Sequence, residues 1–343
     1  MGRAISSKAS SRTALLLPSG RDGVPQSDWK PFMLVTRVDV QAAERRTRGF
    51  VRRTPTFHAA EALSFKLEFL QHTGTFKARG AFNRQLSARE RGELDAEIGI
   101  VVASGGNAGI ANAYAARELG VPATVYLPET APAVKVALLH SLGATVVQTG
   151  SEYVEAFEAA TAFAIERGAL FCHAYDQPEI AAGAGVLAEE MLADDPAIET
   201  ILVAVGGGGL LAGVLAAVDG RAHVVAVEPE RAPTLHTALA AGAPVDVEVG
   251  GIAADSLGAR RVGEIGFAMA RAVGSGLSSV LVSDADIVAA RSSLWSDYRI
   301  PSEYGAAAAA AAMASGAYRP RSGERIAVIV CGANTDPATL TGG

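Results

Sequence analysis

The sequence predicts an α/β protein made of two units, each a mostly parallel sheet with helices packed on it. The 343 residues give room for two domains at roughly 100 to 200 residues each. Hydrophobic residues make up 49% of the chain and charged residues 19%, which provides a sizeable core and excludes a disordered protein. From about residue 98 onward, short apolar runs alternate with helical segments, as in parallel sheets covered by helices.

The first alternating series forms the first predicted unit. Apolar runs predict strands at residues 98–103, 123–127, 144–147 and 169–171. Between them, helical spacing predicts helices at 107–119, at a segment ending near 142, and at about 152–166. Gly120 and Gly143 stand where the first two of these helices end.

The second series begins with a helix at about 181–192 and a strand at 201–205. A glycine run, a helix at 210–218 and a strand at 224–227 follow. Helices fill about 231–317 around one short strand at 279–282, and a strand at 326–330 ends the series. The alanine tract 306–312 predicts a closely packed helix, because alanine loses no side-chain entropy and keeps neighbouring elements close.

Composition excludes several classes of protein. With 30 basic and 36 acidic residues the net charge is −6, so no nucleic-acid partner is expected. Every apolar run is broken well before the roughly 20 residues that span a bilayer, so no membrane helix is expected. Cys172 and Cys331 show no CxxC spacing, and the histidines show no HExxH pairing. Neither a disulfide framework nor a metal site is therefore expected.

The first 34 residues differ from the rest in composition. Residues 1–34 mix Ser, Arg, Lys, Gly and Pro, and we expect them to form a disordered extension. Their one apolar run, 15–17, is too short for a signal-peptide core of about 7 to 15 residues. A transit peptide is the alternative, and a cytoplasmic protein is the expectation.

Two motifs in the first half carry chemistry. The segment TGTFKARG, residues 73–80, places Lys77 among small and apolar residues, where burial lowers the pKa of the amine and favours Schiff-base formation. An ordinary solvated lysine is the alternative. The segment SGGNAG, residues 104–109, follows a strand and opens a helix, so its N–H groups are suited to an anion. A tight turn with Asn107 as the N-cap is the alternative.

Two further motifs follow strands of the second series. Four consecutive glycines, Gly206, Gly207, Gly208 and Gly209, indicate close backbone approach to a ligand such as a phosphate. The run lacks the Gly-Lys-Ser/Thr of a Walker A loop and the GxGxxG spacing, although Glu228 leaves a nucleotide site as an alternative. The turn CGAN, residues 331–334, shares the carboxyl edge of the sheet with the glycine run. Cys331 could equally be a buried apolar side chain.

Together, TGTFKARG, SGGNAG, VGGGGLLAG and VCGAN resemble, in this order, the serine/threonine dehydratase family of fold-type II pyridoxal-phosphate enzymes in the tryptophan synthase β-like superfamily. The similarity runs from about residue 53 to 334 and is greatest to the L-serine dehydratase branch. It implies two open, mostly parallel sheets with helices on both faces, and pyridoxal 5′-phosphate in the cleft between a large and a small domain. The large domain is expected at 35–80 and 178–343, and the small domain at 81–177.

The resemblance also implies roles for individual residues. Lys77 is expected to form the Schiff base, Phe76 to flank the cofactor ring, and Asn107 to meet its ring oxygen. The other expected cofactor contacts are Gly206, Gly207, Gly208 and Gly209 at the phosphate, Cys331 at the pyridine nitrogen, and Glu303 nearby. The residues expected to bind the substrate carboxylate are Thr75, Ser104, Gly105 and Ala108.

The implied reaction is that of an ammonia-lyase: β-elimination of water from L-serine or L-threonine, giving a 2-oxo acid and ammonia. A thiol at the pyridine nitrogen leaves that nitrogen neutral and favours elimination over a long-lived carbanion. The alternatives are a dehydratase for 3-hydroxyaspartate or phenylserine, and a β-replacement synthase. Racemases of the family use a serine where this chain has Gly105, so racemisation is expected to be at best a side reaction.

The resemblance carries three further expectations. Metal-dependent relatives hold a cation with two acidic residues; here Glu228 matches the first and Thr234 replaces the second, so no metal is expected. Asn334 lies near the end of the chain, so a regulatory extension with isoleucine feedback is not expected. A homodimer acting on a small amino acid is expected.

Overall fold

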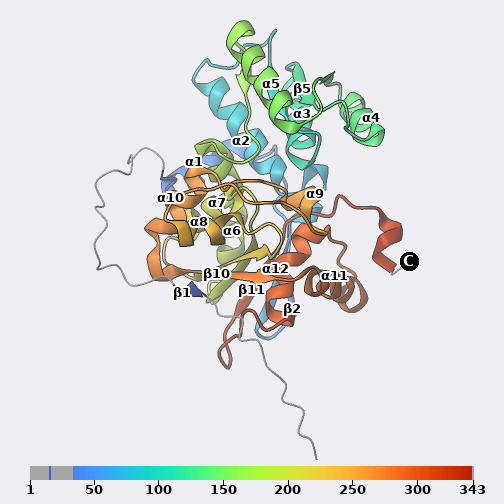
Figure 1. Ribbon diagram of the computed structural model, residues 1–343. Helices are drawn as coiled ribbons and strands as arrows, with labels where there is room; N and C mark the ends of the chain where they lie inside the picture. Colours follow the sequence, from blue (N-terminus) through green and yellow to red (C-terminus); the bar gives the residue numbers. More distant parts are fainter. Residues whose placement is uncertain (1–14, 17–33, 342–343) are drawn as a thin grey trace, which may run out of the picture.

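The larger of two sheets forms the base of the molecule in the computed structural model, which describes residues 15–16 and 34–341 (Figure 1). Five central strands run parallel, and an antiparallel strand flanks them at each edge. In spatial order the strands are β1 (Leu15–Leu16), β10 (Leu277–Val282), β9 (His223–Pro229), β8 (Thr200–Ala204), β11 (Ile326–Val330), β3 (Leu63–Leu67) and β2 (Thr56–Ala60).

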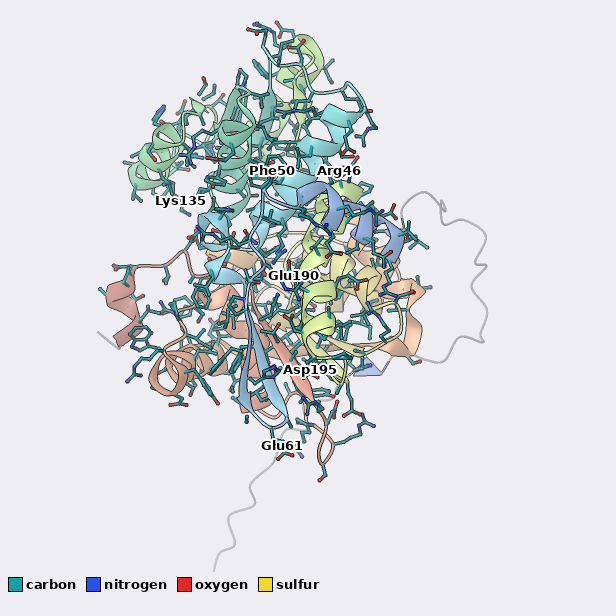
Figure 2. All side chains as sticks on the ribbon, turned by 180° about the vertical axis from the view of Figure 1, so that it is seen from behind. Arg46, Phe50, Glu61, Lys135, Glu190 and Asp195 are labelled. Carbon is teal, nitrogen blue, oxygen red and sulfur yellow. The ribbon has the colours of Figure 1, made fainter. Side chains whose placement is uncertain are left out.

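The smaller sheet lies above it in Figure 1 and is parallel throughout. Its order is β6 (Thr145–Gln148), β5 (Ala123–Leu127), β4 (Ile100–Ala103) and β7 (Leu170–Phe171). The helices of this unit are α2 (Lys77–Glu90), α3 (Asn107–Leu119), α4 (Ala133–Ser141) and α5 (Tyr153–Arg167). From behind, Lys135 of α4 lies at the side of the smaller unit, and Glu61, at the β2–β3 turn, lies at the lower end of the larger unit (Figure 2).

Helices cover both faces of the larger sheet (Figure 1). On one side lie α1 (Arg37–Thr47), α6 (Pro178–Asp194), α7 (Gly209–Val218), α8 (Thr234–Ala241) and α10 (Glu264–Ala272). On the other lie α9 (Ala254–Leu257), α11 (Asp284–Tyr298) and α12 (Tyr304–Ala314). The predicted class, two mostly parallel sheets with helices on both faces, is confirmed.

Burial explains why the central strands form. Every residue of β4, β8 and β11 is buried, because parallel strands with helices on both faces expose neither face to water. Helix α12 packs directly on β8, β9 and β11, and most of its alanines are buried. Helices α6 and α7 approach closely at Gly185 and Gly213, where a Cβ on Gly213 would lie 2.1 Å from the carbonyl oxygen of Ala181.

The hairpin of β2 and β3 is a feature of the fold that was not predicted; the first predicted strand starts at residue 98. The predicted extension 1–34 lies outside the described residues except for β1 and Leu34.

The predicted domain limit at residue 80 falls within α2, which continues to Glu90. Within the described part of the chain, none of the helices combines the length and apolar character that crossing a bilayer requires.

Candidate active site

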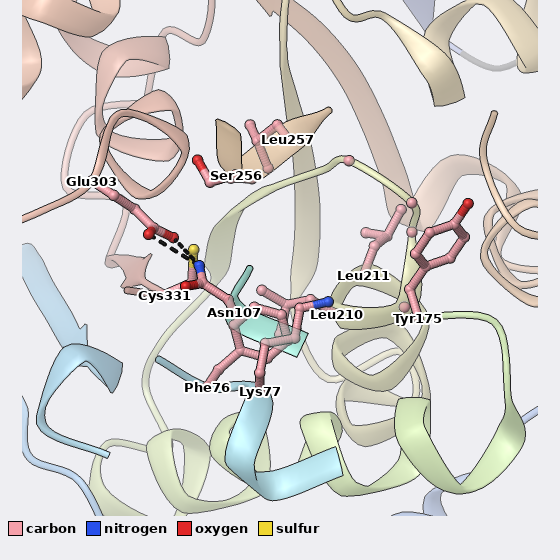
Figure 3. A pocket seen from close by; sticks show the side chains of 15 residues that line it. Phe76, Lys77, Asn107, Tyr175, Leu210, Leu211, Ser256, Leu257, Glu303 and Cys331 are labelled. Carbon is pink, nitrogen blue, oxygen red and sulfur yellow. Dashed lines mark hydrogen bonds between the residues drawn. The ribbon is translucent and has the colours of Figure 1, made fainter. Parts of the chain in front are cut away.

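A cavity opens at the carboxyl ends of β8 and β11, between the two sheets (Figure 3). It encloses about 480 Å³ of space, part of it open to solvent. Every residue expected to contact the cofactor lines it: Phe76, Lys77, Asn107, Gly206, Gly207, Gly208, Gly209, Glu303 and Cys331. Tyr175, Ser256 and Leu257 line the same cavity and were not predicted from the sequence.

Lys77 is the first residue of α2, and its amine reaches the cavity. Its Nζ donates a hydrogen bond to the carbonyl oxygen of Ala174 at 2.7 Å and lies 5.1 Å from the centre of the Phe76 ring. Burial of the amine lowers the pKa of Lys77 to about 8, against the opposing influence of Cys331 and Glu303. A substantial fraction of the amine is therefore neutral near pH 8, as a nucleophilic lysine requires.

The backbone around Lys77 is tied to the end of β11. The N–H of Phe76 donates to the carbonyl oxygen of Cys331 at 2.9 Å, and Thr75 forms an isolated antiparallel bridge with Gly332. A Cβ on Gly332 would lie 2.7 Å from Thr75 Cγ2, so a larger residue there would displace the Thr75 side chain. These contacts explain why two motifs far apart in sequence meet at one site.

The glycine loop between β8 and α7 forms the opposite wall. Its carbonyl groups are engaged by the protein: Gly206 accepts from the Thr234 hydroxyl at 2.6 Å, and Gly207 accepts from the N–H of Gly263 at 3.0 Å. Gly208 has a φ of +86°, which favours glycine. The first N–H groups of α7 have no acceptor within the helix, and the helix dipole makes this end positive.

Side chains would not fit in this loop. A Cβ on Gly207 would lie 2.4 Å from the Tyr175 ring, and one on Gly209 would lie 2.5 Å from the Tyr175 carbonyl oxygen. The loop is thus a bare backbone cradle at a helix N-terminus, the arrangement that binds phosphate groups. Together with the amine of Lys77, it suits a ligand that carries both an aldehyde and a phosphate.

Asn107, the first residue of α3, joins the two units across the cavity (Figure 3). Its Nδ2 donates to both carboxyl oxygens of Glu303 at 3.0 Å, and Asn334 Nδ2 donates to its Oδ1 at 2.8 Å. Burial raises the pKa of Glu303 to about 7, against the hydrogen bond from Asn107. Burial also raises the pKa of the Cys331 thiol, which stays uncharged at neutral pH.

The residues expected to bind the substrate carboxylate lie beside the cavity rather than on its lining. Ser104, Gly105 and Ala108 lie where β4 ends and α3 begins, and Thr75 is fully buried next to Phe76. The Ser104 hydroxyl accepts from the N–H of Gly106 at 3.3 Å. Their substrate role remains a prediction.

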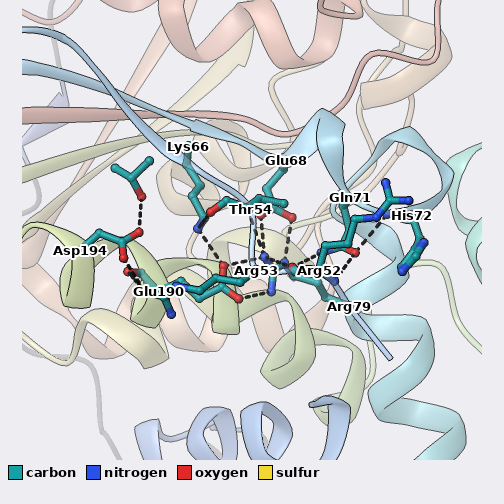
Figure 4. Close-up of polar contacts among 11 residues, drawn as sticks. Arg52, Arg53, Thr54, Lys66, Glu68, Gln71, His72, Arg79, Glu190 and Asp194 are labelled. Carbon is teal, nitrogen blue, oxygen red and sulfur yellow. Dashed lines mark hydrogen bonds and ion pairs between the residues drawn. The ribbon is translucent and has the colours of Figure 1, made fainter. Parts of the chain in front are cut away.

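A buried ion network supports the helix that carries Lys77 (Figure 4). Arg79, two residues further along α2, donates to Glu68 and Glu190 at 2.8 Å, and Lys66 donates to Glu190 at 2.8 Å. Each of these four side chains is at most 6% exposed. Two cations and two carboxylates balance, so the network fixes the start of α2 without leaving an unpaired charge.

Glu228 and Thr234, considered above for a cation site, form a helix cap. The Glu228 carboxyl group accepts from the N–H groups of Leu235 and His236 at 2.7 and 2.8 Å, and its Oε1 lies 3.1 Å from the Thr234 hydroxyl oxygen. Its oxygens are therefore engaged at the start of α8. Across residues 15–16 and 34–341, no group of three or more His, Cys, Asp or Glu side chains is arranged to hold a metal ion.

The comparisons with known proteins agree with this geometry. A family model described as pyridoxal-phosphate dependent enzyme matches residues 47–332. A phenylserine dehydratase of Ralstonia pickettii is 35% identical over 305 residues, covering 86% of this chain and 92% of the relative. An L-threonine ammonia-lyase of Geobacter sulfurreducens is 36% identical over 312 residues, covering 88% of this chain and 76% of the relative.

Solved structures extend the similarity to the fold. Maize serine racemase superposes with a TM-score of 0.80 at 28% identity, covering 89% of this chain and 95% of that one. The range that the family model matches includes every residue that lines the cavity between the sheets. The chain belongs to the pyridoxal-phosphate dependent enzymes, and pyridoxal phosphate is its cofactor.

Proposed function

We propose that this enzyme removes water from a β-hydroxy amino acid, L-serine or L-threonine, and releases a 2-oxo acid and ammonia. The observation that carries the proposal is the buried Lys77 amine facing the bare glycine cradle across one cavity. The relatives named as a phenylserine dehydratase and a threonine ammonia-lyase support this reaction class. Phenylserine, 3-hydroxyaspartate and β-replacement remain alternatives for the substrate and outcome.

The residues present fit the cofactor in three respects. The cradle of Gly206, Gly207, Gly208 and Gly209 would hold its phosphate, and Lys77 would hold its aldehyde carbon. The uncharged thiol of Cys331 would face its ring nitrogen without adding a proton there. When bound, pyridoxal phosphate supplies an electron sink that weakens the bond between the substrate Cα and its hydrogen.

The elimination takes the proton from the substrate Cα and delivers a proton to the departing hydroxyl group, which leaves as water. Lys77 is the base for the α-proton, because a pKa of about 8 lets it accept and return a proton near neutral pH. The N–H groups at the start of α3, from Ser104 to Ala108, would bind the substrate carboxylate. Asn107, held by Glu303 and Asn334, would fix the cofactor ring from the side of the smaller sheet.

The test combines cofactor attachment with a substrate panel. The purified protein should absorb visible light, and borohydride should fix the cofactor to Lys77. A panel of L-serine, L-threonine, phenylserine and 3-hydroxyaspartate is then assayed for 2-oxo acid. A colourless protein that gains no colour with added cofactor, or no release from any of the four, would reject the proposal. A nucleotide-binding module would instead be protected by nucleotide and indifferent to Lys77→Ala.

Racemisation is the second candidate, because maize serine racemase is a structural neighbour. Gly105 has no side chain to act as a second acid, and a Cβ there would lie 2.8 Å from Leu127 Cδ2. A positioned acid contributes roughly 100- to 10,000-fold, so its absence favours elimination. Measuring D-serine against pyruvate from L-serine separates the two, and D-serine forming as fast as pyruvate would refute the Gly105 argument.

A homodimer in the cytoplasm completes the proposal. Both cysteines, Cys172 and Cys331, are free and buried, which suits a reducing compartment. Light scattering at micromolar concentration should give twice the chain mass of 35.1 kDa. A single-chain mass would reject the dimer.

A further inference from the structure

The segment of residues 172–177, which we name the crossover, connects β7 of the smaller sheet to α6 of the larger unit. It contacts the residues that line the cavity at Ala174 and Tyr175, and it contacts α10 at Asp176. The carbonyl oxygen of Ala174 accepts from Lys77 Nζ at 2.7 Å, and the Tyr175 ring packs on Gly207. The Asp176 carboxylate accepts from the first N–H groups of α10, at 3.1 and 3.0 Å.

His173 holds the crossover in this shape. Its Nδ1 lies 3.1 Å from the backbone nitrogen of Tyr175 and 2.8 Å from that of Asp176. Both backbone groups are donors, so Nδ1 has to accept with its lone pair. Only the neutral imidazole with its proton on Nε2 can do this.

The surroundings of His173 also disfavour the protonated ring. Tyr175, Phe157 and Phe171 surround it at ring-centre distances of 4.7, 5.8 and 6.4 Å. Burial lowers the pKa of His173, Asp176 on the crossover opposes that effect, and Lys77 on α2 adds to it. The facing side chain of α5 is the uncharged Phe157, so these two charges are the ones that act on the ring.

We propose that His173 is a positioning residue whose neutral Nε2–H form presents the Ala174 carbonyl to Lys77 and the Tyr175 ring to the glycine loop. A proton on Nδ1 would face two N–H groups that also donate, and the turn would open. The consequence for cofactor binding rests on the proposed function. The affinity for pyridoxal phosphate is therefore highest at pH values above the pKa of His173, and it decreases as the pH falls through that pKa.

Two variants separate this role from simple packing. In His173→Asn, Oδ1 occupies the same bonded position as Nδ1 and accepts from N–H groups two and three residues ahead, but it does not titrate. His173→Phe keeps an aromatic ring and lacks the acceptor. All three proteins share Lys77 and Glu303, so differences among them report on residue 173.

The first measurement is the dissociation constant of pyridoxal phosphate, titrated by absorbance at pH 8 and at a pH low enough for His173 to be protonated, as read from its ring nitrogens in the second measurement. We expect His173→Phe to bind about tenfold or more weakly than wild type at pH 8, because two partly buried donors lose their acceptor. We expect His173→Asn to bind within about threefold of wild type and to lose less affinity on acidification. Equal binding by His173→Phe, or an unchanged pH dependence in His173→Asn, would overturn the proposal.

The second measurement needs no cofactor. Nitrogen NMR of the histidine rings, assigned by difference against His173→Asn, should show Nδ1 unprotonated and a pKa below the usual value of about 6.5. A proton on Nδ1, or ordinary titration, would refute the inference even if His173→Phe failed to fold. A wild-type protein that bound no pyridoxal phosphate would instead reject the proposed function, and the NMR result would still decide the role of His173.

Discussion

Gly207→Ala tests whether the shape of the glycine loop controls cofactor binding. The new Cβ would lie 2.4 to 2.5 Å from three atoms of the Tyr175 ring, whereas ordinary contact begins at 3.4 Å. The loop and the ring therefore have to separate by about 1 Å, and overpacking of this kind costs about 1–3 kcal/mol. If this cost falls on the bound state, the dissociation constant of pyridoxal phosphate rises about 5- to 150-fold.

The assay is titration of apoprotein with pyridoxal phosphate, followed by absorbance. Gly276→Ala is the matched control, because its new Cβ meets only Val273 Cβ, at 3.7 Å. In a Tyr175→Ala background, Gly207→Ala should lower the affinity by a smaller factor than it does in wild type, because the ring that the new methyl group meets is absent. Wild-type affinity in Gly207→Ala, or the same loss in both backgrounds, would refute the reasoning.

Three further predictions concern charged groups. Arg79→Met leaves two buried glutamates to share one lysine and should destabilise the protein by about 3–5 kcal/mol in urea unfolding, and a loss below 1 kcal/mol would contradict this. Lys135→Met removes the exposed ion pair with Asp255 and should change stability by less than about 1 kcal/mol in the same assay. Because burial raises the Glu303 pKa from 4.5 to about 7, the wild type loses stability as pH rises through that interval. The Glu303→Gln variant can still accept a hydrogen bond from Asn107. Its free energy of unfolding, measured relative to that of wild type, should rise by about 3 kcal/mol between pH 4.5 and 8. A difference in unfolding free energy that stays constant with pH would refute the raised pKa of Glu303.

Much of the fold could be predicted, because parallel strands are short, apolar and bounded by glycine. Helix α3 and strands β5 and β11 lie at the predicted residues. The hairpin strand β3 was missed because Lys66 interrupts its apolar pattern. That lysine is buried only because Glu190, 124 residues away, supplies its partner. A contact at that separation leaves no local signal in the sequence.

The candidate site likewise contains residues that could be predicted from the sequence and residues that could not. Lys77, the glycine run and Cys331 stand in compact motifs and were found, and all of them line the cavity. Tyr175 was missed because a tyrosine after a short strand has no distinctive spacing, and its role depends on the backbone of Gly207. The pairing of His173 with the turn that follows it was a possible signal, since the acceptor and its donors are only two and three residues apart.

The alanine-rich helix α12 has a consequence for how the sequence can vary. Glu303 is the residue immediately before it, and Ala307, Ala308 and Ala309 are fully buried where α12 packs between the larger sheet and α11. Any larger residue there would push the helix outward and carry Glu303 away from Asn107. The alanine tract looks like a low-complexity sequence by composition, but we expect it to be among the segments that tolerate substitution least. In a saturation mutagenesis screen, its inner positions should tolerate fewer replacements than the exposed Ile165 of α5.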